Sequence, residues 1–301
     1  YNLAWALKLS GKEQEAIKQF AKLAADYPAS PLAGESHYRV GEFAFQNNDY
    51  QAAAVAYHAA AEKAAGTPLG ERASHKLGLA FFKRAEYEQA CAAFRYQMTA
   101  YPEGPLAEDA CFWAAECLFK QEKYADALAE YSRLRSASNK EHQVLALLHA
   151  GQAAGRLGQW EKSLEWLALA AQQSPGSPLL PEILYEQAWA HQNLGHVERA
   201  LAIYKDVIAK SAGEPAARAQ LMIGQIQLQA KQHDRAAESF LKVFYGYSFP
   251  KWQADAAMQA ARCYEILGKK EDAKRLYQRV IDQLPQTDAA PTARQRLAEL
   301  K

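Results

Sequence analysis

The chain has 301 residues, half of them apolar or aromatic, and its acidic and basic residues nearly cancel to a formal charge of +1. Near-neutrality argues against a general binder of nucleic acid or of anionic membrane surfaces. No stretch approaches the ~20 uninterrupted apolar residues that cross a bilayer, so we expect no direct membrane span.

A small residue followed four positions later by a large apolar or aromatic residue recurs along the whole chain. Successive copies are 36 or 37 residues apart. Such a fixed period is typical of repeat proteins, in which each unit packs on its neighbours. The pairs, in chain order, are Ala16 and Phe20, Ala53 and Tyr57, Ala90 and Phe94, Ala127 and Tyr131, Ser163 and Leu167, Ala200 and Tyr204, Ala236 and Phe240, and Ala273 and Tyr277.

Three further elements keep the same phase. An apolar residue followed by Gly or Ala precedes most pairs, as in Leu77-Gly78, and its small member lets two helices approach closely. A polar break such as Leu157-Gly158-Gln159 lies just before the pair, where Gly ends a helix. A proline connector such as Tyr101-Pro102 follows it. Each unit is therefore predicted to be helix, short turn, helix, longer turn.

The pattern predicts an all-α solenoid of about eight helical hairpins, forming a single domain over residues 1–301. A last helix after Pro285 would cap the array or begin a truncated unit. The predicted repeats are 1–32, 33–69, 70–106, 107–141, 142–179, 180–215, 216–251 and 252–288, with the cap at 289–301.

Together these elements resemble the tetratricopeptide repeat, whose pattern is W-x2-L-G-x2-Y, then A-x3-F, then P. The third copy lacks only the opening Trp. The resemblance implies a right-handed α-α superhelix whose first helices line the concave surface and bind a protein or peptide segment. The matching residues are Ser74, Leu77, Gly78, Phe81, Ala90, Phe94 and Pro102.

The period is longer than the usual 34 residues, and the extra residues fall in the connectors. Residues 28–33 and 102–107 both read Pro-x-Ser/Gly-Pro-Leu-Ala. This connector resembles the variant found in bacterial cell-envelope tetratricopeptide proteins, such as outer-membrane assembly lipoproteins and the Tol-Pal coordinator. The resemblance favours a periplasmic or envelope-associated location over a cytoplasmic one. Because Tyr1 falls within a helical pattern, we expect the sequence to be part of a longer chain.

The first helices carry a second stripe of side chains beside the one that packs on the partner helix. Phe45, Phe82 and Phe119 recur in it at intervals of 37 residues. The resemblance places this aromatic ladder on the concave face, where aromatic and Arg side chains suit capture of a peptide. The alternative is that the rings only pack between hairpins. The other predicted partner-binding residues are Tyr38, Arg72, His75, Lys83, Phe112, Tyr185 and Trp189.

The sequence lacks the common motifs of catalytic, nucleotide-binding and metal sites. It contains no H-E-x-x-H, G-x-x-x-x-G-K-S/T or G-x-S-x-G motif. The four cysteines have neither metal-ligand nor redox spacing, and the eight histidines are scattered. Chaperone-binding tetratricopeptide domains hold a peptide C-terminus in a carboxylate clamp of Lys and Asn on successive first helices. The Asn is absent from the corresponding positions here, so we expect no such clamp. We therefore expect no enzyme activity, no cofactor and no metal site.

The sequence thus predicts a non-enzymatic scaffold that binds another protein or a peptide, with bacterial envelope assembly as its setting. Two alternatives stay open. One is an accessory tetratricopeptide domain of a larger enzyme or secretion complex, and the other is an oligomerisation module that acts by self-association.

Overall fold

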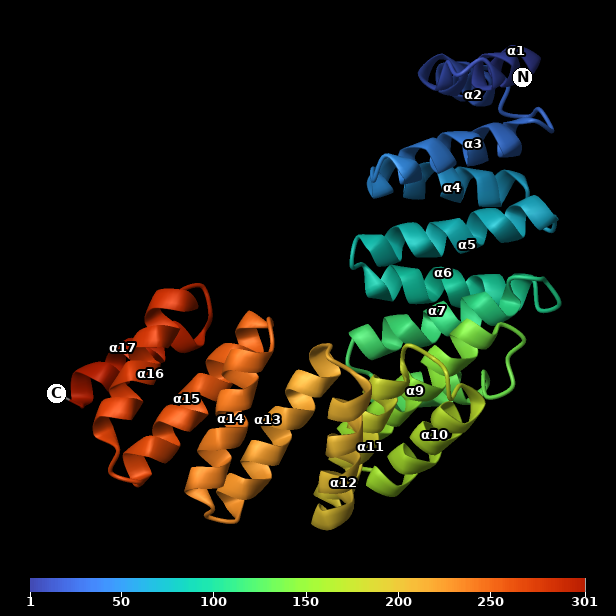
Figure 1. Cartoon of the computed structure of the whole chain (residues 1–301). Coiled ribbons are helices and arrows are strands. Elements are labelled where there is room, and N and C mark those ends of the chain that lie inside the picture. The colour runs from blue at the N-terminus through green and yellow to red at the C-terminus, as the bar shows by residue number, and fades with distance from the viewer. Residues whose placement is uncertain (301) are drawn as a thin grey trace. The chain divides into compact units, whose positions relative to one another are not determined.

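The computed structural model describes residues 1–300, and every regular element in that range is an α-helix. The chain divides into two compact units, the first spanning Tyr1–Gly158 and the second beginning at Gln159. In each unit the helices stack in chain order (Figure 1). The all-helical repeat fold is thereby confirmed, whereas the single domain over residues 1–301 and its repeat boundaries stay predictions.

The first unit contains nine helices among its described residues. They are α1 (Asn2–Leu9), α2 (Glu13–Asp26), α3 (Ala33–Gln46), α4 (Tyr50–Lys63), α5 (Pro68–Lys83), α6 (Tyr87–Ala100), α7 (Ala107–Lys120), α8 (Tyr124–Ser132) and α9 (Lys140–Arg156).

The second unit, up to residue 300, contains eight. They are α10 (Trp160–Gln173), α11 (Leu180–Asn193), α12 (Val197–Lys210), α13 (Glu214–Gln229), α14 (His233–Gly246), α15 (Pro250–Ile266), α16 (Lys270–Gln283) and α17 (Ala289–Glu299).

The repeated small and large pair builds the core of every hairpin. All eight large members, from Phe20 to Tyr277, are fully buried. A Cβ atom at Gly78 would lie 2.6 Å from the ring of Phe94, and one at Gly224 would lie 2.6 Å from the ring of Phe240. Glycine at these points therefore allows the first helix to lie directly against the aromatic ring of the second.

The short turn inside each hairpin contains one residue in the left-handed region. Glycine occupies it in some turns, as at Gly195 with φ +78°, and larger residues in others, as at Ala85 with φ +59°. A left-handed residue after a helix ends it and redirects the chain, which is how the second helix folds back on the first.

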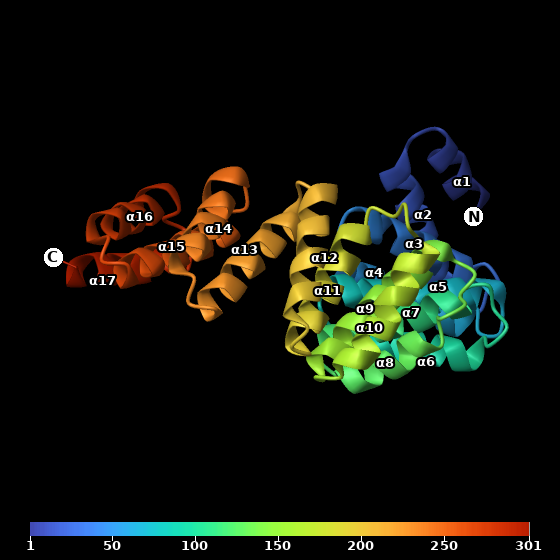
Figure 2. The same cartoon turned by 60° about the horizontal axis from the view of Figure 1, so that its bottom comes forward.

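From α3 to α9 and from α11 to α17, the first helices of neighbouring hairpins lie closer together than the second helices do. Within the first unit α3 contacts α5, α5 contacts α7, and α7 contacts α9; within the second unit α11, α13, α15 and α17 form the same series. The second helices of neighbouring hairpins are farther apart and meet through long side chains, as where Arg279 on α16 donates to the Tyr245 hydroxyl on α14 at 2.9 Å. The first helices therefore form the inner, more tightly curved layer of each unit (Figures 1 and 2).

Candidate functional site

In the first unit, a buried carboxylate joins three helices on the inner layer. The Tyr131 hydroxyl on α8 donates a hydrogen bond of 2.6 Å to Glu116 on α7, and His149 Nδ1 on α9 lies 2.5 Å from the same carboxylate oxygen. Burial alone would raise the Glu116 pKa, but His149 and the Tyr131 hydroxyl outweigh it and hold that pKa below its usual range.

The same arrangement occurs two repeats earlier, with a lysine in place of the histidine. The Tyr57 hydroxyl donates to Glu42 at 2.6 Å, and Lys76 Nζ on the following first helix lies 3.3 Å from that carboxylate. A carboxylate on one first helix thus receives a hydroxyl from its own hairpin and a nitrogen group from the next. These contacts fix neighbouring hairpins to each other and leave less of the inner face free for a partner.

The three rings of the aromatic ladder are half-buried, and each contacts the tyrosine that begins the second helix of its own hairpin. The ring centroids are 5.2 to 5.4 Å apart and the rings meet edge to face. The pairs are Phe45 with Tyr50, Phe82 with Tyr87, and Phe119 with Tyr124.

Each ladder ring also contacts the first helix of the next hairpin. Lys76 Nζ lies 5.4 Å from the centroid of Phe45, and the Trp113 ring lies 5.0 Å from Phe82. His149 stacks on Phe119 at 5.5 Å. The rings therefore pack between hairpins, and their contact with a partner stays a prediction.

Three other predicted binding residues of the first unit are buried. Tyr38 lies 5.6 Å from the ring of Tyr57, and Phe112 stacks on His142 at 4.3 Å. His75 Nδ1 is 3.1 Å from the side-chain oxygen of Gln97, and burial lowers the His75 pKa.

Two predicted cations of the first unit lie at its surface. The Arg72 guanidinium lies 5.6 Å from the Tyr38 ring. Lys83 ends α5 and is exposed. These two residues keep their charges accessible on the inner layer, whereas the predicted aromatic residues around them are mostly packed.

In the second unit, Tyr185 and Trp189 project from α11. Tyr185 is buried beneath the Arg218 guanidinium, which lies 3.8 Å from its ring centroid. Arg218 also bonds Glu182 at 2.7 Å, so it is held firmly in place. Trp189 meets Trp160 edge to face at 5.0 Å.

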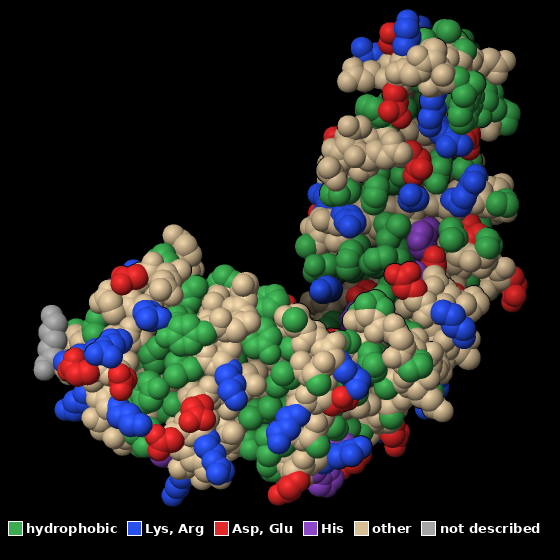
Figure 3. Space-filling model, viewed as in Figure 1, with side chains coloured by type: hydrophobic (Ala, Val, Ile, Leu, Met, Phe, Trp, Pro, Cys, Tyr) green, Lys and Arg blue, Asp and Glu red, His purple; other side chains and the backbone are tan. Residues whose placement is uncertain are grey.

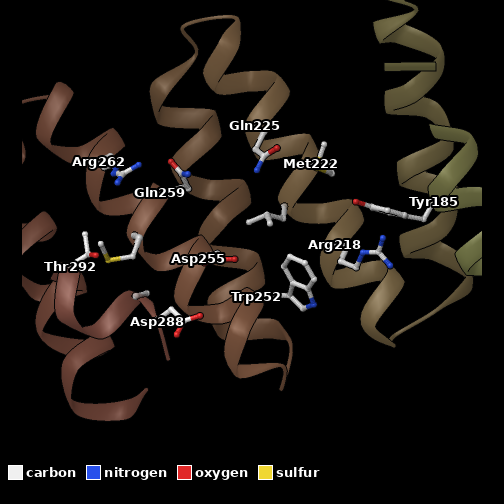
Figure 4. Close-up of a pocket in the computed structure, with 13 residues that line it drawn as sticks. Tyr185, Arg218, Met222, Gln225, Trp252, Asp255, Gln259, Arg262, Asp288 and Thr292 are labelled. Atoms are coloured by element: carbon white, nitrogen blue, oxygen red, sulfur yellow. The ribbon is translucent and has the colours of Figure 1, made fainter. Parts of the chain in front are cut away.

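A cavity of about 480 Å³ opens on the inner layer of this unit, along α11, α13, α15 and α17 (Figure 4). Leu221, Met222 and Met258 supply apolar surface, with the aromatic rings of Tyr185 and Trp252 beside them. Pockets of this size with apolar walls and a few polar groups are the usual binding sites of proteins. Of the predicted residues, only Tyr185 lines it.

Several polar side chains of the cavity have no hydrogen bond or ion pair within residues 1–300. They are Gln225, Asp255, Gln259 and Arg262, and they come from α13 and α15. Trp252 differs from them, because its indole Nε1 donates to Glu214 at 2.8 Å. Unpaired polar groups around a cavity are available to a ligand.

Sequence reasoning missed these cavity residues because it followed aromatic repetition. A signal was present in the spacing of α15, where Trp252, Asp255, Gln259 and Arg262 lie three, four and three residues apart and therefore share one helix face. The residue types differ from one repeat to the next, so no period marks them.

The described residues offer no group of three or more metal-binding side chains, and none of their helices is long and apolar enough to cross a membrane. The space-filling view shows apolar and oppositely charged side chains interspersed over its visible face (Figure 3). The geometry is that of a helical-repeat protein whose second unit has a cavity along its first helices.

Comparison with known proteins defines the family. A tetratricopeptide repeat model matches residues 1–70, 75–142, 118–178 and 185–247, and a second one matches residues 255–287. The chain belongs to the tetratricopeptide repeat family. No curated protein matches it.

Solved structures share its fold at low sequence identity. The apo form of RapI has a TM-score of 0.61 at 13% identity, covering 96% of this chain and 82% of RapI. PilW, a type IV pilus biogenesis factor, has a TM-score of 0.57 at 18% identity, covering 74% of this chain and 97% of PilW. YrrB, a tetratricopeptide protein with an unusual peptide-binding site, has 0.53 at 18%, covering 66% and 96%.

Proposed function

We propose that the chain is a non-enzymatic scaffold that binds a segment of another protein in the groove of its second unit. The observation that carries the proposal is the cavity along α11, α13, α15 and α17, whose apolar floor is surrounded by unpaired polar side chains. Proteins of this repeat family typically act through protein interaction, and their first helices supply the contact surface.

The chemistry of the cavity suits a peptide. The amide side chains of Gln225 and Gln259 each provide a donor and an acceptor, which is what a peptide backbone requires when it leaves water. Met222 and Met258 adapt their shape to an apolar side chain, and Trp252 gives a rigid aromatic contact.

The first unit supplies the second part of the proposal. Its predicted inner-face residues Phe45, Phe82 and Phe119 would extend partner contact beyond the cavity, with Arg72 and Lys83 as accessible cations. Replacing the three rings by Ala tests this. A far greater loss of partner binding than of thermal stability supports contact, and an equal loss of both assigns the rings to packing alone.

The setting we propose is the bacterial envelope. The proline connectors at 28–33 and 102–107 support it by their resemblance to envelope tetratricopeptide proteins, and PilW, which shares the fold, is a pilus biogenesis factor. Fractionation of the native host tests this location. Recovery of the protein only with cytoplasmic enzymes would contradict it.

A site-specific crosslinker tests the groove directly. Benzoylphenylalanine placed at Met222 in the cavity is expected to form an adduct with the partner in cells. The same group at Glu238, exposed on the second helix α14, is the matched control and should form none. In the Met222 background, Trp252→Ala should lower the adduct at least tenfold, because aromatic anchors contribute ~2 kcal/mol or more.

Two outcomes would reject the groove. One is equal adduct at both positions, and the other is adduct at Met222 that Trp252→Ala leaves unchanged. Circular dichroism of each variant confirms that the helical fold is retained, so that loss of adduct reports loss of binding.

A further inference from the structure

The unpaired charges of the groove have opposite signs at its two ends. Asp255 and Arg262 both lie on α15 and line the cavity. They are seven residues apart, which is about two helical turns, so they project from the same side with ~10 Å between their positions along the axis. Both are exposed, and neither forms an ion pair within residues 1–300.

The Asp255 end is acidic and aromatic. Asp288, at the start of α17, lines the same cavity as Asp255 (Figure 4). The Trp252 ring lies next to Asp255 in the same view. The neighbouring protein atoms remove part of the water around the Asp255 carboxylate although the residue is exposed, and this partial desolvation, followed by the negative charge of Asp288, raises the Asp255 pKa despite the opposing charge of Lys251. Two carboxylates that repel each other beside an indole ring favour an entering cation.

The chain's own cations near this end form no ion pair with its two carboxylates. Lys251 Nζ lies 5.0 Å from the ring centroid of Trp252, and Arg218 bonds Glu182 and Glu186. No lysine or arginine in the described part of the chain forms an ion pair with Asp255 or Asp288.

The Arg262 end of the site offers hydrogen-bond donors. Gln259 and Thr292 line the cavity near it, and Figure 4 shows both on the same side of the cavity as the guanidinium. An unpaired guanidinium with its fixed fork of N–H donors recognises carboxylates, which it can bind through two parallel hydrogen bonds.

We propose that the groove of the second unit selects an extended peptide with a lysine or arginine opposite Asp255 and Asp288, and an aspartate or glutamate opposite Arg262, about three residues away. This inference rests on the proposed function. The spacing follows from the geometry, because an extended chain advances ~3.3 Å per residue and must cover ~10 Å.

The arrangement disfavours other charged ligands. A nucleic acid or another polyanion would meet the two carboxylates at the Asp255 end, and a polycation would meet Arg262 at the other. Charge complementarity of this kind fixes the register of a bound segment and rejects wrong partners.

Selection from a random library tests the inference and requires no identified partner. A library of random peptides, each about twelve residues long, is displayed on phage and selected against the intact chain. Binding of the selected peptides is then measured by fluorescence anisotropy. We expect a basic and an acidic residue two to four positions apart, which spans the ~10 Å of the site.

Charge reversal locates the recognition. Asp255→Lys and Arg262→Glu should each weaken the selected peptides at least tenfold. The double variant D255R/R262D should prefer a peptide with its two charges exchanged. Glu238→Lys on α14 and Arg294→Glu on α17 are matched controls at exposed positions outside the cavity and should bind normally.

The possible failures are distinguishable. Peptides that lose binding in Trp252→Ala but carry no charge pattern, or tolerate Asp255→Lys, overturn this inference and leave the groove as the binding site. A library that yields no peptide sensitive to Trp252→Ala overturns both proposals.

Discussion

Two pairs of neighbouring first helices, α7 with α9 and α13 with α15, share one helical architecture but treat their charges differently. Between α7 and α9 of the first unit, two pairs join neighbouring first helices, His142 with Asp109 at 2.9 Å and His149 with Glu116 at 2.5 Å. Between α13 and α15 of the second unit, no ion pair occurs within residues 1–300. The cavity lies along this second pair of helices.

The difference shows how one helical repeat can either pack against its neighbour or leave side chains available for a ligand. Where a carboxylate on one first helix meets a nitrogen group on the next, the inner face is satisfied by its own residues. Where these partners are missing, polar side chains such as Gln225 and Asp255 remain available around an apolar floor. The backbone period is the same in both places, so the distinction lies in side chains alone.

The largest expected effect tests whether the two units share one kind of core. Phe94 and Phe240 are both fully buried against a glycine of the first helix. Phe94→Ala and Phe240→Ala should each reduce the unfolding free energy of their own unit by ~3–5 kcal/mol, because each leaves a cavity. Hydrogen exchange of α5 and α6, or of α13 and α14, measures the loss in the intact chain. A loss under ~1 kcal/mol in one unit would show that the cores differ.

A smaller effect should separate charged from neutral acceptors. Tyr131 donates to the Glu116 carboxylate at 2.6 Å, whereas Tyr204, at the equivalent position of the second unit, donates to the Gln192 amide oxygen at 3.0 Å. Tyr131→Phe should cost ~1.5–3 kcal/mol and Tyr204→Phe ~0.5–1.5 kcal/mol, since hydrogen bonds to charged groups are stronger. Urea unfolding measures both. Equal losses would contradict the contrast between a charged and a neutral acceptor.

The core was predictable from the sequence because it is periodic. The same small and large pair is required in every hairpin, and all eight large members prove to be fully buried. The left-handed turn residue follows the same period even where it is not glycine, as at Ala85. A constraint that every repeat must satisfy produces a periodic residue pattern, which can be recognised in a single sequence.

The contacts of the inner face were predictable only in part. The spacing of Phe45, Phe82 and Phe119 identifies a stripe, but it does not show what each ring touches. The neighbour of Phe82 is Trp113, whereas Phe45 and Phe119 meet Lys76 and His149 at the same repeat position, so the residue type there does not repeat. The cavity was harder to predict than the ladder. It depends on the lack of ion pairs between α13 and α15, and no sequence pattern marks such a lack.

The smallest effect concerns pH, and the carboxylates of Glu116 and Asp255 should change stability with opposite sign. The Glu116 pKa lies below its usual range, so its contribution to stability is present above the unfolded-state pKa and is lost as the pH falls through the folded-state pKa. The Asp255 pKa is raised, so the folded state binds more protons, and stability declines as the pH rises through the window between the unfolded and folded pKa values.

Glu116→Gln should therefore remove stability at neutral pH and little in acid, whereas Asp255→Asn should be neutral or stabilising at neutral pH. Urea unfolding of each variant and the parent chain, between about pH 3 and pH 7, measures the two slopes. Slopes of the same sign would contradict the description of Glu116 as a satisfied carboxylate and of Asp255 as an unpaired one.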